Sequence, residues 1–473
     1  MPSIFQFIFP KDKPLFNYIF TLAIPVIISN ISRVMMGLVD TAMVGHLGAN
    51  AIAAVGMASM VTWTAMSLGI AFRTGTQALV SRRLGQKKYS ECGIALRNMQ
   101  LFVLLIGIPL TYLCYSNTTQ IMSFFIKDSY ALELCIEYSL NIFLSIYFIY
   151  ASFVFQGFYT GIERTRVHMK VVLSSNVLNL YLNVGLIFGS IQIEEFLSTS
   201  IFNFLAILWL PFNFPELGVK GAAIGTLVAT IWGCFHYAFY LFDNQIKSKY
   251  EVFKNTLDMQ MLKKQLTIAY PLAFQEFLVM LSLTFFYKII ALIGIIQLAA
   301  TQIIFKIMHA SFMPAIGIGQ ACATLVGKYL GEENPDKAER AIKESLRGSI
   351  YIMGSVGICF ILFSNFLIPI FIDDNDVIKL AVPGLRFIGL LQIIDAICFT
   401  LWFALTGAGD TKIPAIFDIL NHWLVFIPLC YFLSIYCGYG YWGAWFSFAV
   451  HLIFIAIFMS IRFKMGHWKK IKF

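Results

Sequence analysis

The stretch ALVSRRLG at positions 78–85 returns as TLVGKYLG at positions 324–331, a separation of 246 residues. Three other segments repeat at the same separation: LAIPVII with IAYPLAF (Pro25 and Pro271), HLGANAIAA (46–54) with LIGIIQLAA (292–300), and TGIERTR (160–166) with TGAGDTK (406–412). Four matches at one offset indicate that one long, mostly apolar unit was duplicated. In a membrane protein, two similar halves are typical of a transporter whose halves rock about a site between them.

The composition places the chain in a bilayer. Apolar residues make up 59% of it and charged residues only 12%, about half the share of charge in soluble proteins, and the mean hydropathy is +0.77. Apolar stretches of about 20 residues match the length that crosses the hydrocarbon core of a membrane. We predict twelve spans, at 16–43, 51–79, 94–115, 134–158, 167–190, 218–242, 262–290, 297–326, 347–371, 380–405, 412–435 and 440–463.

The net charge of +9 is explained better by membrane orientation than by a nucleic-acid partner. Counted by predicted side of the membrane, 26 lysines and arginines fall on one side and only three, Lys127, Lys220 and Lys379, fall on the other. Positive residues accumulate on the cytoplasmic side, so we expect both termini in the cytoplasm. Six spans return the chain to its starting side, so the two halves form a parallel repeat about an axis along the membrane normal. We therefore expect an all-α polytopic protein of a plasma (bacterial inner) membrane, with twelve transmembrane helices in two six-helix lobes related by pseudo-twofold symmetry.

The basic stretch 243–264 is the predicted cytoplasmic linker between a lobe at 1–242 and a lobe at 265–473. Gly221 and Gly443 stand in similar segments that are only 222 positions apart, so the first half holds 24 extra residues (246 − 222). These residues fall within 191–218. We interpret that segment as an interfacial or lid-like excursion, because a thirteenth span would invert the second half.

Ionisable groups inside spans are costly and therefore mark candidate functional sites. The first span holds Arg33 and Asp40. The other candidates lie in the second half: Glu276 and Lys288 in the seventh span, Lys306 and His309 in the eighth, Asp395 in the tenth, and Asp418 and His422 in the eleventh. His236 and His451 are weaker candidates.

Asp40 is the principal candidate for a cation or proton site in the first half. The alternative is a carboxylate that is hydrated near the external interface or paired with Arg33, which lies two turns away on the same helix face. Asn176, Asn179 and Asn183 form one polar stripe on the fifth span. Their amides can donate to a carboxylate or coordinate a small cation through oxygen, or they can simply join helices by hydrogen bonds worth roughly 0.6–2 kcal/mol each.

Glu276 and Asp395 are the corresponding candidates in the second half. Glu276 follows Pro271 by five residues, close to the carbonyl that a helical proline leaves unpaired. Carboxylates on two spans can meet in the bundle interior, where removal from water favours their protonated forms. Such a pair can carry a proton or hold Na⁺; the alternative is charge compensation by Lys288 or Lys306. The pairs Lys306 with His309 and Asp418 with His422 fit a structural role at least as well, although Lys306 is a candidate to tune the carboxylates.

Several motifs resemble the multidrug and toxic compound extrusion (MATE) transporters, of the NorM-like and DinF-like branches. They are VDTAMVGHLG with AIAAVG after Pro25, TQALVSRRLG after the second span, the asparagine spacing of the fifth span, and LQIIDA with TGAGDTKIPA near the tenth and eleventh spans. The resemblance covers essentially the whole chain. It implies two lobes facing each other in a V, and efflux of organic cations coupled to inward H⁺ or Na⁺.

The resemblance also implies roles for individual residues. Asp40 matches the cation-coupling carboxylate of the first lobe, Glu276 and Asp395 match the acidic pair of the second lobe, and Asn179 matches an asparagine of the DinF-like site. Asn183 departs from the pattern, since DinF-like members carry a second aspartate there. Glu163 also departs from it, because a small residue is more usual at that position.

We therefore predict a secondary active antiporter that exports amphipathic or cationic organic compounds by alternating access, with Pro25 and Pro271 as hinges. The coupling ion is H⁺ or Na⁺. If it is Na⁺, we expect it at Glu276 and Asp395 or at Asp40 and Asn179. The candidates to tune these sites are Arg33, Lys288, Lys306 and Asp418. We expect a monomer in contact with membrane lipid, without cofactor or enzymatic activity. The alternatives are a flippase for lipid-linked saccharides, which favours a strongly cationic cavity, and, less favoured, a membrane-embedded enzyme or a passive channel.

Overall fold

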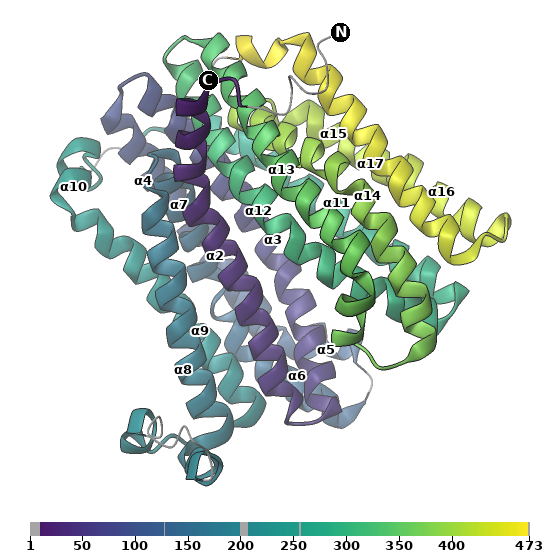
Figure 1. The fold of residues 1–473 in the computed structure, drawn as a ribbon. Helices are drawn as coiled ribbons and strands as arrows, with labels where there is room; N and C mark the ends of the chain where they lie inside the picture. Colours follow the sequence, from purple (N-terminus) through teal and green to yellow (C-terminus); the bar gives the residue numbers. More distant parts are fainter. Residues whose placement is uncertain (1–9, 127, 199–206, 255–256, 472–473) are drawn as a thin grey trace.

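Long helices build the whole of the computed structural model, which describes residues 10–126, 128–198, 207–254 and 257–471 (Figure 1). The first half comprises α2 (Lys13–Gly45), α3 (Ala49–Gly85), α4 (Tyr89–Ser116), α5 (Thr118–Phe125), α6 (Ser129–Phe143), α7 (Ile146–Gly161), α8 (Thr165–Ser198), α9 (Gly218–Phe239) and the short α10 (Asn244–Tyr250). The second half comprises α11 (Met259–Ile293), α12 (Ile295–Gly331), α13 (Pro335–Leu367), α14 (Asn375–Gly407), α15 (Lys412–Leu420), α16 (Ile427–Tyr431) and α17 (Gly440–Met465).

The number of membrane-crossing helices agrees with the sequence. In the described ranges, 11 helices are long and apolar enough to cross a membrane, and a twelfth span results if the bent pair α6 and α7 counts as one. That pair bends by 45° around positions 144–145, in the middle of the predicted fourth span. Helices satisfy all their backbone hydrogen bonds internally, which is the condition for crossing hydrocarbon.

The duplication is visible in the helix limits themselves. The helices α2, α3, α4 and α6 begin at 13, 49, 89 and 129, and α11, α12, α13 and α14 begin at 259, 295, 335 and 375, each 246 positions later (259 − 13 = 246). Equivalent caps start the first helix of each half: Asp12 accepts a hydrogen bond from the Leu15 amide, and Asp258 accepts from the amides of Gln260 and Met261. The repeat in sequence is therefore a repeat in structure.

The extra segment of the first half follows α8. The α8 backbone breaks at Gly189 (φ 71°) and continues to Ser198, while residues 199–206 lie outside the described ranges. The returning chain packs on α8, because the Trp209 indole donates to the Tyr181 carbonyl (2.8 Å) and the Leu217 amide donates to the Leu186 carbonyl (2.8 Å). None of the membrane-crossing helices found in the described ranges begins between α8 and α9.

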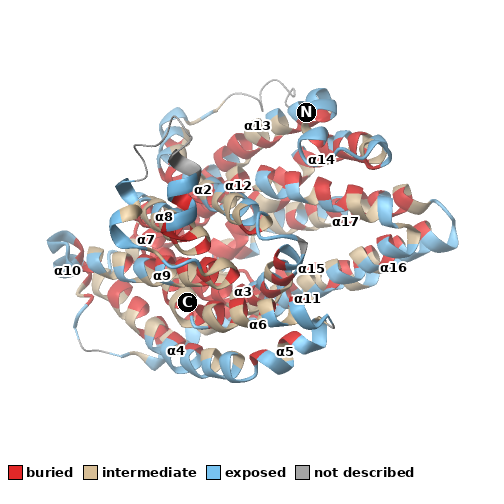
Figure 2. Ribbon diagram, turned by 90° about the horizontal axis from the view of Figure 1, so that it is seen from below, coloured by how far each residue is buried: buried red, intermediate tan, exposed pale blue. Residues whose placement is uncertain are grey.

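Much of the outer surface of the helix bundle carries exposed apolar side chains, and Figure 2 shows exposed residues around a buried centre. Large apolar side chains such as Leu105, Phe124 and Ile295 are 72–83% exposed. Such a surface is unstable in water and suits lipid. Polar residues inside the bundle therefore stand out against an apolar background.

The two halves contact each other at the end of the molecule where α2 begins and α17 ends (Figure 1). There α3 packs on α12 so closely that a Cβ added at Gly85 would overlap the Lys328 carbonyl, and one added at Gly331 would overlap the Arg82 carbonyl. Gln77 donates to the Gln320 carbonyl (2.8 Å), and Lys328 forms an ion pair with Glu163 (2.8 Å). This end is closed by polar and backbone contacts.

Candidate functional site

A cavity of about 400 Å³ lies among α2, α3, α6, α7, α8 and α9; we call it the first-half cavity. Aromatic side chains form much of its wall, including Trp63, Tyr138 and Phe153, and Arg33 and Asp40 of α2 also line it. A mostly apolar hollow with a few convergent polar groups is the usual form of a small-molecule site.

Asp40 is held at this cavity by the asparagine stripe of α8. Asn183 is fully buried and donates to Asp40 Oδ1 at 2.8 Å. With the Asn179 amide nitrogen turned toward Asp40, it donates to Oδ1 at 3.3 Å while its oxygen accepts from the Thr226 hydroxyl at 3.3 Å. Asn176 lies one turn away and donates to the Ser32 hydroxyl at 2.7 Å. The structure thus brings Asp40 together with Asn179 and Asn183, and places Asn176 in the same cavity.

The sequence scan of ionisable residues missed a second polar group beside the cavity. Arg73 of α3, His168 of α8 and Tyr237 of α9 are buried, and the His168 Nδ1 lies 2.5 Å from the Tyr237 hydroxyl. The Arg73 guanidinium lies over the Phe153 ring, 5.9 Å from its centroid. Both ionisable residues fall inside predicted spans, 51–79 and 167–190, so the rule that singled out Arg33 and Asp40 selects them as well.

In the second half, Asp418, His422 and His451 form a buried group that we call the second-half cluster. Asp418 Oδ1 lies 3.2 Å from His422 Nδ1, and the two histidine rings are 4.2 Å apart. Gln275 of α11 donates to Asp418 Oδ2 at 2.5 Å. His422 sits on η5 (Asn421–Phe426), a turn of π-helix, a feature that often occurs at functional sites.

The second-half cluster has the chemistry of a metal site. One ligand atom from each of the three side chains lies within 4.8 Å of the others. An oxygen and two imidazole nitrogens suit Zn²⁺ and other divalent transition metals. The Nδ1 of His422 also lies 2.9 Å from the Asp418 carbonyl, and such a backbone contact fixes the orientation of metal-binding histidines.

The two predicted carboxylates of the second half are not joined to each other. In the described ranges no hydrogen bond or ion pair connects Glu276 with Asp395. Glu276 is half-buried and directly follows Gln275, the residue that donates to Asp418. Asp395 is only 2% exposed, and its Oδ2 has no hydrogen-bond partner among the described residues.

The predicted tuning lysines and hinge prolines do not belong to the polar groups described above. Lys288 and Lys306 are exposed, and neither is in an ion pair within the ranges that the structure describes. Pro25 and Pro271 are buried inside the continuous helices α2 and α11. The carbonyl of Pro25 accepts a hydrogen bond from the Ser29 hydroxyl at 2.7 Å.

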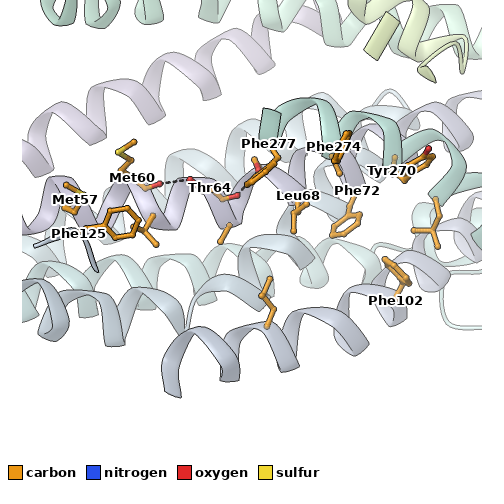
Figure 3. Close-up of a pocket in the computed structure, with 17 residues that line it drawn as sticks. Met57, Met60, Thr64, Leu68, Phe72, Phe102, Phe125, Tyr270, Phe274 and Phe277 are labelled. Atoms are coloured by element: carbon orange, nitrogen blue, oxygen red, sulfur yellow. Dashed lines mark hydrogen bonds between the residues drawn. The ribbon is translucent and has the colours of Figure 1, made fainter. Parts of the chain in front are cut away.

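A larger cavity, of about 710 Å³, lies where the halves meet (Figure 3). Its wall combines Met60, Leu68 and Phe72 of α3 with Tyr270, Phe274 and Phe277 of α11. The wall carries no ionisable carboxylate or base among the lining residues. Flexible methionines and aromatic rings give a surface that adapts to differently shaped apolar molecules.

Comparison with solved structures gives the same fold. The chain aligns with the structure described as an outward-facing conformation of a multidrug resistance MATE family transporter of the MOP superfamily, with TM-score 0.86, 19% identity and 97% of each chain covered. It also aligns with a MOP superfamily transporter from Pyrococcus furiosus, with TM-score 0.85, 18% identity and 100% of this chain and 99% of that chain covered. These likenesses confirm the predicted fold class, an all-helical polytopic membrane protein of about twelve spans in two six-helix lobes.

Sequence relatives cover the full length. The chain is 27% identical to the probable multidrug resistance protein NorM of Thermotoga maritima, over 99% of this chain and 97% of the relative. It is 25% identical to the uncharacterized transporter YisQ of Bacillus subtilis, over 97% and 96%. The MatE family model matches residues 25–184 and 271–432, two segments that begin 246 positions apart (271 − 25 = 246) and together cover more than half of the sequence. The chain therefore belongs to the MatE family and is a transporter rather than an enzyme.

Proposed function

We propose that this transporter is a secondary active antiporter that exports amphipathic or cationic organic compounds and takes up H⁺ or Na⁺ in exchange. Two curated relatives carry names that mark them as probable multidrug resistance proteins. The observation that carries the proposal is the position of Asp40, a carboxylate within a membrane-crossing helix that borders a cavity with aromatic walls.

The coupling follows from competition for a single negative charge. A carboxylate surrounded by amide donors and little water has a strong electrostatic need for a cation or a proton. A bound coupling ion neutralises Asp40 and removes its attraction for a cationic substrate, so that the two ligands favour different states. Antiport requires that difference, because a ligand that binds both states equally shifts neither.

In the second half we propose Glu276 and Asp395 as further coupling residues. Asp395 is buried, and its Oδ2 has no hydrogen-bond partner in the described part of the chain, which suits a carboxyl that gains and loses a proton or binds Na⁺. Gln275, which directly precedes Glu276 on α11, donates to Asp418. Asp418 is therefore a candidate to tune Glu276, with Lys288 and Lys306 as more distant candidates.

The proposed organisation assigns 1–242 to the first lobe, 243–264 to a cytoplasmic linker and 265–473 to the second lobe, in a monomer. The contacts of α3 with α12 lie at the end that carries most of the basic residues, such as Arg82, Arg83 and Lys328. The excess of positive charge supports a cytoplasmic location for that end, in a bacterial inner membrane. The larger cavity would then offer apolar compounds a lining between the lobes, and Pro25 and Pro271 would let α2 and α11 bend.

Efflux from proteoliposomes with pH and Na⁺ gradients imposed separately tests the proposal. A cationic fluorescent dye should leave vesicles of the reverse orientation only when one of the two gradients is present. Asp40→Asn, Glu276→Gln and Asp395→Asn, each made alone, should reduce gradient-driven efflux. Flux that needs no gradient would indicate a channel, and undiminished efflux in all three variants would refute the assignment of the coupling residues.

A further inference from the structure

The second-half cluster draws its three side chains from two successive spans. Asp418 lies on α15 and His422 follows it by four residues on η5, and both are buried. Residues four apart share a helix face, the spacing with which two side chains of one helix hold a single metal ion in many enzymes. His451 of α17, also buried, adds the third side chain from a second helix.

Each imidazole of the cluster has one nitrogen that the protein does not use. His422 Nδ1 donates to the Asp418 carbonyl at 2.9 Å, and His451 Nδ1 lies 2.9 Å from the Asn421 side-chain nitrogen. Within the ranges that the structure describes, no hydrogen bond reaches the Nε2 atom of either ring. A histidine whose Nδ1 is held by a hydrogen bond is oriented to bind a metal through the other nitrogen.

Buried oxygens of the same group lack hydrogen-bond donors. Among the described residues, Asp418 Oδ1, Gln275 Oε1 and Asn421 Oδ1 have no partner, and these three residues are only 2–7% exposed. Gln275 donates to the Asp418 carboxylate, and Asn421 donates to the His451 carbonyl, so both residues belong to the surroundings of the cluster. Buried acceptors without donors are costly, and a bound cation satisfies several of them at once.

We propose that the second-half cluster binds a divalent transition-metal ion such as Zn²⁺ through the Asp418 carboxylate and the imidazoles of His422 and His451. Imidazole ligands favour such ions over Na⁺, Mg²⁺ and Ca²⁺, which prefer oxygen. The hydrogen bond from Gln275 to Asp418 Oδ2 leaves Oδ1 for the ion and orients the carboxylate. The ion joins the eleventh span to the twelfth, and it does so whether or not the protein is an antiporter.

The first half has no equivalent of this site. At the offsets of the repeat, the positions of Asp418, His422 and His451 correspond to Val172, Asn176 and Ala229, of which none carries a carboxylate, an imidazole or a thiol. The proposal therefore predicts one ion for each chain, although the chain is a repeat.

Metal analysis of the full-length protein in detergent, purified without a polyhistidine tag, tests the site. After removal of metals with a chelator, wild type should take up about one Zn²⁺ per chain, and excess Na⁺, Mg²⁺ or Ca²⁺ should not reduce this uptake. Cu²⁺ in place of Zn²⁺ should give an electron paramagnetic resonance spectrum with coupling to two imidazole nitrogens, one from each histidine. No uptake of Zn²⁺, or a Cu²⁺ spectrum without nitrogen coupling, would overturn the proposal.

Substitutions of similar size assign the ion to residues. Asp418→Asn, His422→Gln and His451→Gln should each weaken Zn²⁺ binding by about a hundredfold or more, whereas Gln275→Leu, which removes only the orienting hydrogen bond, should weaken it by about tenfold. Each histidine variant should also lose one nitrogen coupling in the Cu²⁺ spectrum. His309→Gln, which removes a histidine of α12 outside the cluster, is the matched control and should bind as wild type does. Undiminished binding in the three ligand variants, or an equal loss in the control, would refute the assignment.

Thermal unfolding separates loss of the site from loss of the fold. Zn²⁺ should raise the unfolding temperature of wild type and Mg²⁺ should not, because a ligand that binds only the folded protein stabilises it. A variant that unfolds at the wild-type temperature without metal, and that no longer responds to Zn²⁺, has lost the site alone. A wild-type unfolding temperature that does not respond to Zn²⁺ would contradict the inference without any variant.

Discussion

The interiors of the two halves differ most at positions that correspond in the repeat. The first-half cavity is lined by Ile149, Val172, Asn176 and Ala229. At the offsets of 246 for the first three and 222 for the last, the second half carries Asp395, Asp418, His422 and His451. Where the first half is hollow and lined by small or neutral residues, the second half is filled by carboxylates and imidazoles that are at most 7% exposed.

This difference shows that the two copies kept the same helices after the duplication, while the side chains in their interiors diverged. Asp40 itself corresponds to Phe286, which is fully buried. The first half therefore offers its charge to a cavity, whereas the second half encloses its charges in a hydrogen-bonded cluster. We expect substrate and ion to meet in the first half, and the second half to respond to ions alone.

Replacing Asp40 is the most direct test of the difference between the two halves. Asp40→Asn keeps a side chain of equal size and removes the charge, so we expect gradient-driven dye efflux to fall by about a hundredfold, with little change in thermal unfolding. Asp395→Asn should reduce the same flux by a smaller factor. Efflux rates from proteoliposomes, normalised to the amount of folded protein, compare the two variants. A larger loss of efflux for Asp395→Asn would show that the second half, not the first, holds the main coupling carboxylate.

The second-half cluster should contribute more to stability than the asparagine stripe. Asp418→Ala removes a buried carboxylate and leaves Gln275 and His422 without their partner, which should lower the free energy of unfolding by about 3 kcal/mol. Asn176→Ala, at the position equivalent to His422, should cost only about 0.6–2 kcal/mol. Thermal unfolding in detergent compares the two, and equal losses would show that the halves are energetically alike.

Filling the first-half cavity should make it resemble the second half. Ala229→His places at the cavity wall the side chain found at the equivalent His451, and should weaken binding of aromatic probes by about tenfold because the cavity loses volume. Ala456→His, five residues after His451 on α17 of the second half, is a control for the general effect of an added imidazole. Unchanged probe affinity in Ala229→His would place the binding site elsewhere, with the larger cavity of Figure 3 as the next candidate.

The smallest effect is expected at Asn183. Asn183→Asp places a second carboxylate within hydrogen-bond distance of Asp40, and two close carboxylates bind a cation more strongly than one. We expect Na⁺ to stimulate efflux several-fold more in this variant than in wild type. A Na⁺ titration of transport at fixed pH measures the change, and an identical titration curve would argue against a coupling ion at Asp40.

The sequence predicted the twelve spans and the repeat because both depend on local hydropathy and on matched motifs. It also placed Asp40 with Asn179 and Asn183, since the spacing of the asparagines defines one face of a helix. It did not predict that Gln275, next to Glu276, donates to Asp418, because the packing of distant helices decides which polar groups meet. The sequence also did not predict the π-helix that carries His422, since the hydropathy of that segment is that of an ordinary span.

The contact between Gly85 and Gly331 carries a record of how the chain arose. Gly85 fits against the Lys328 carbonyl and Gly331 fits against the Arg82 carbonyl, and both pairs are related by the same 246 positions. A reciprocal contact, in which the same two positions meet in both directions, is typical of a two-fold interface between identical subunits. The seam is thus built like the interface of a homodimer whose two subunits are joined in one polypeptide. Once fused, either copy was free to mutate alone, an option that identical subunits encoded by one gene do not have.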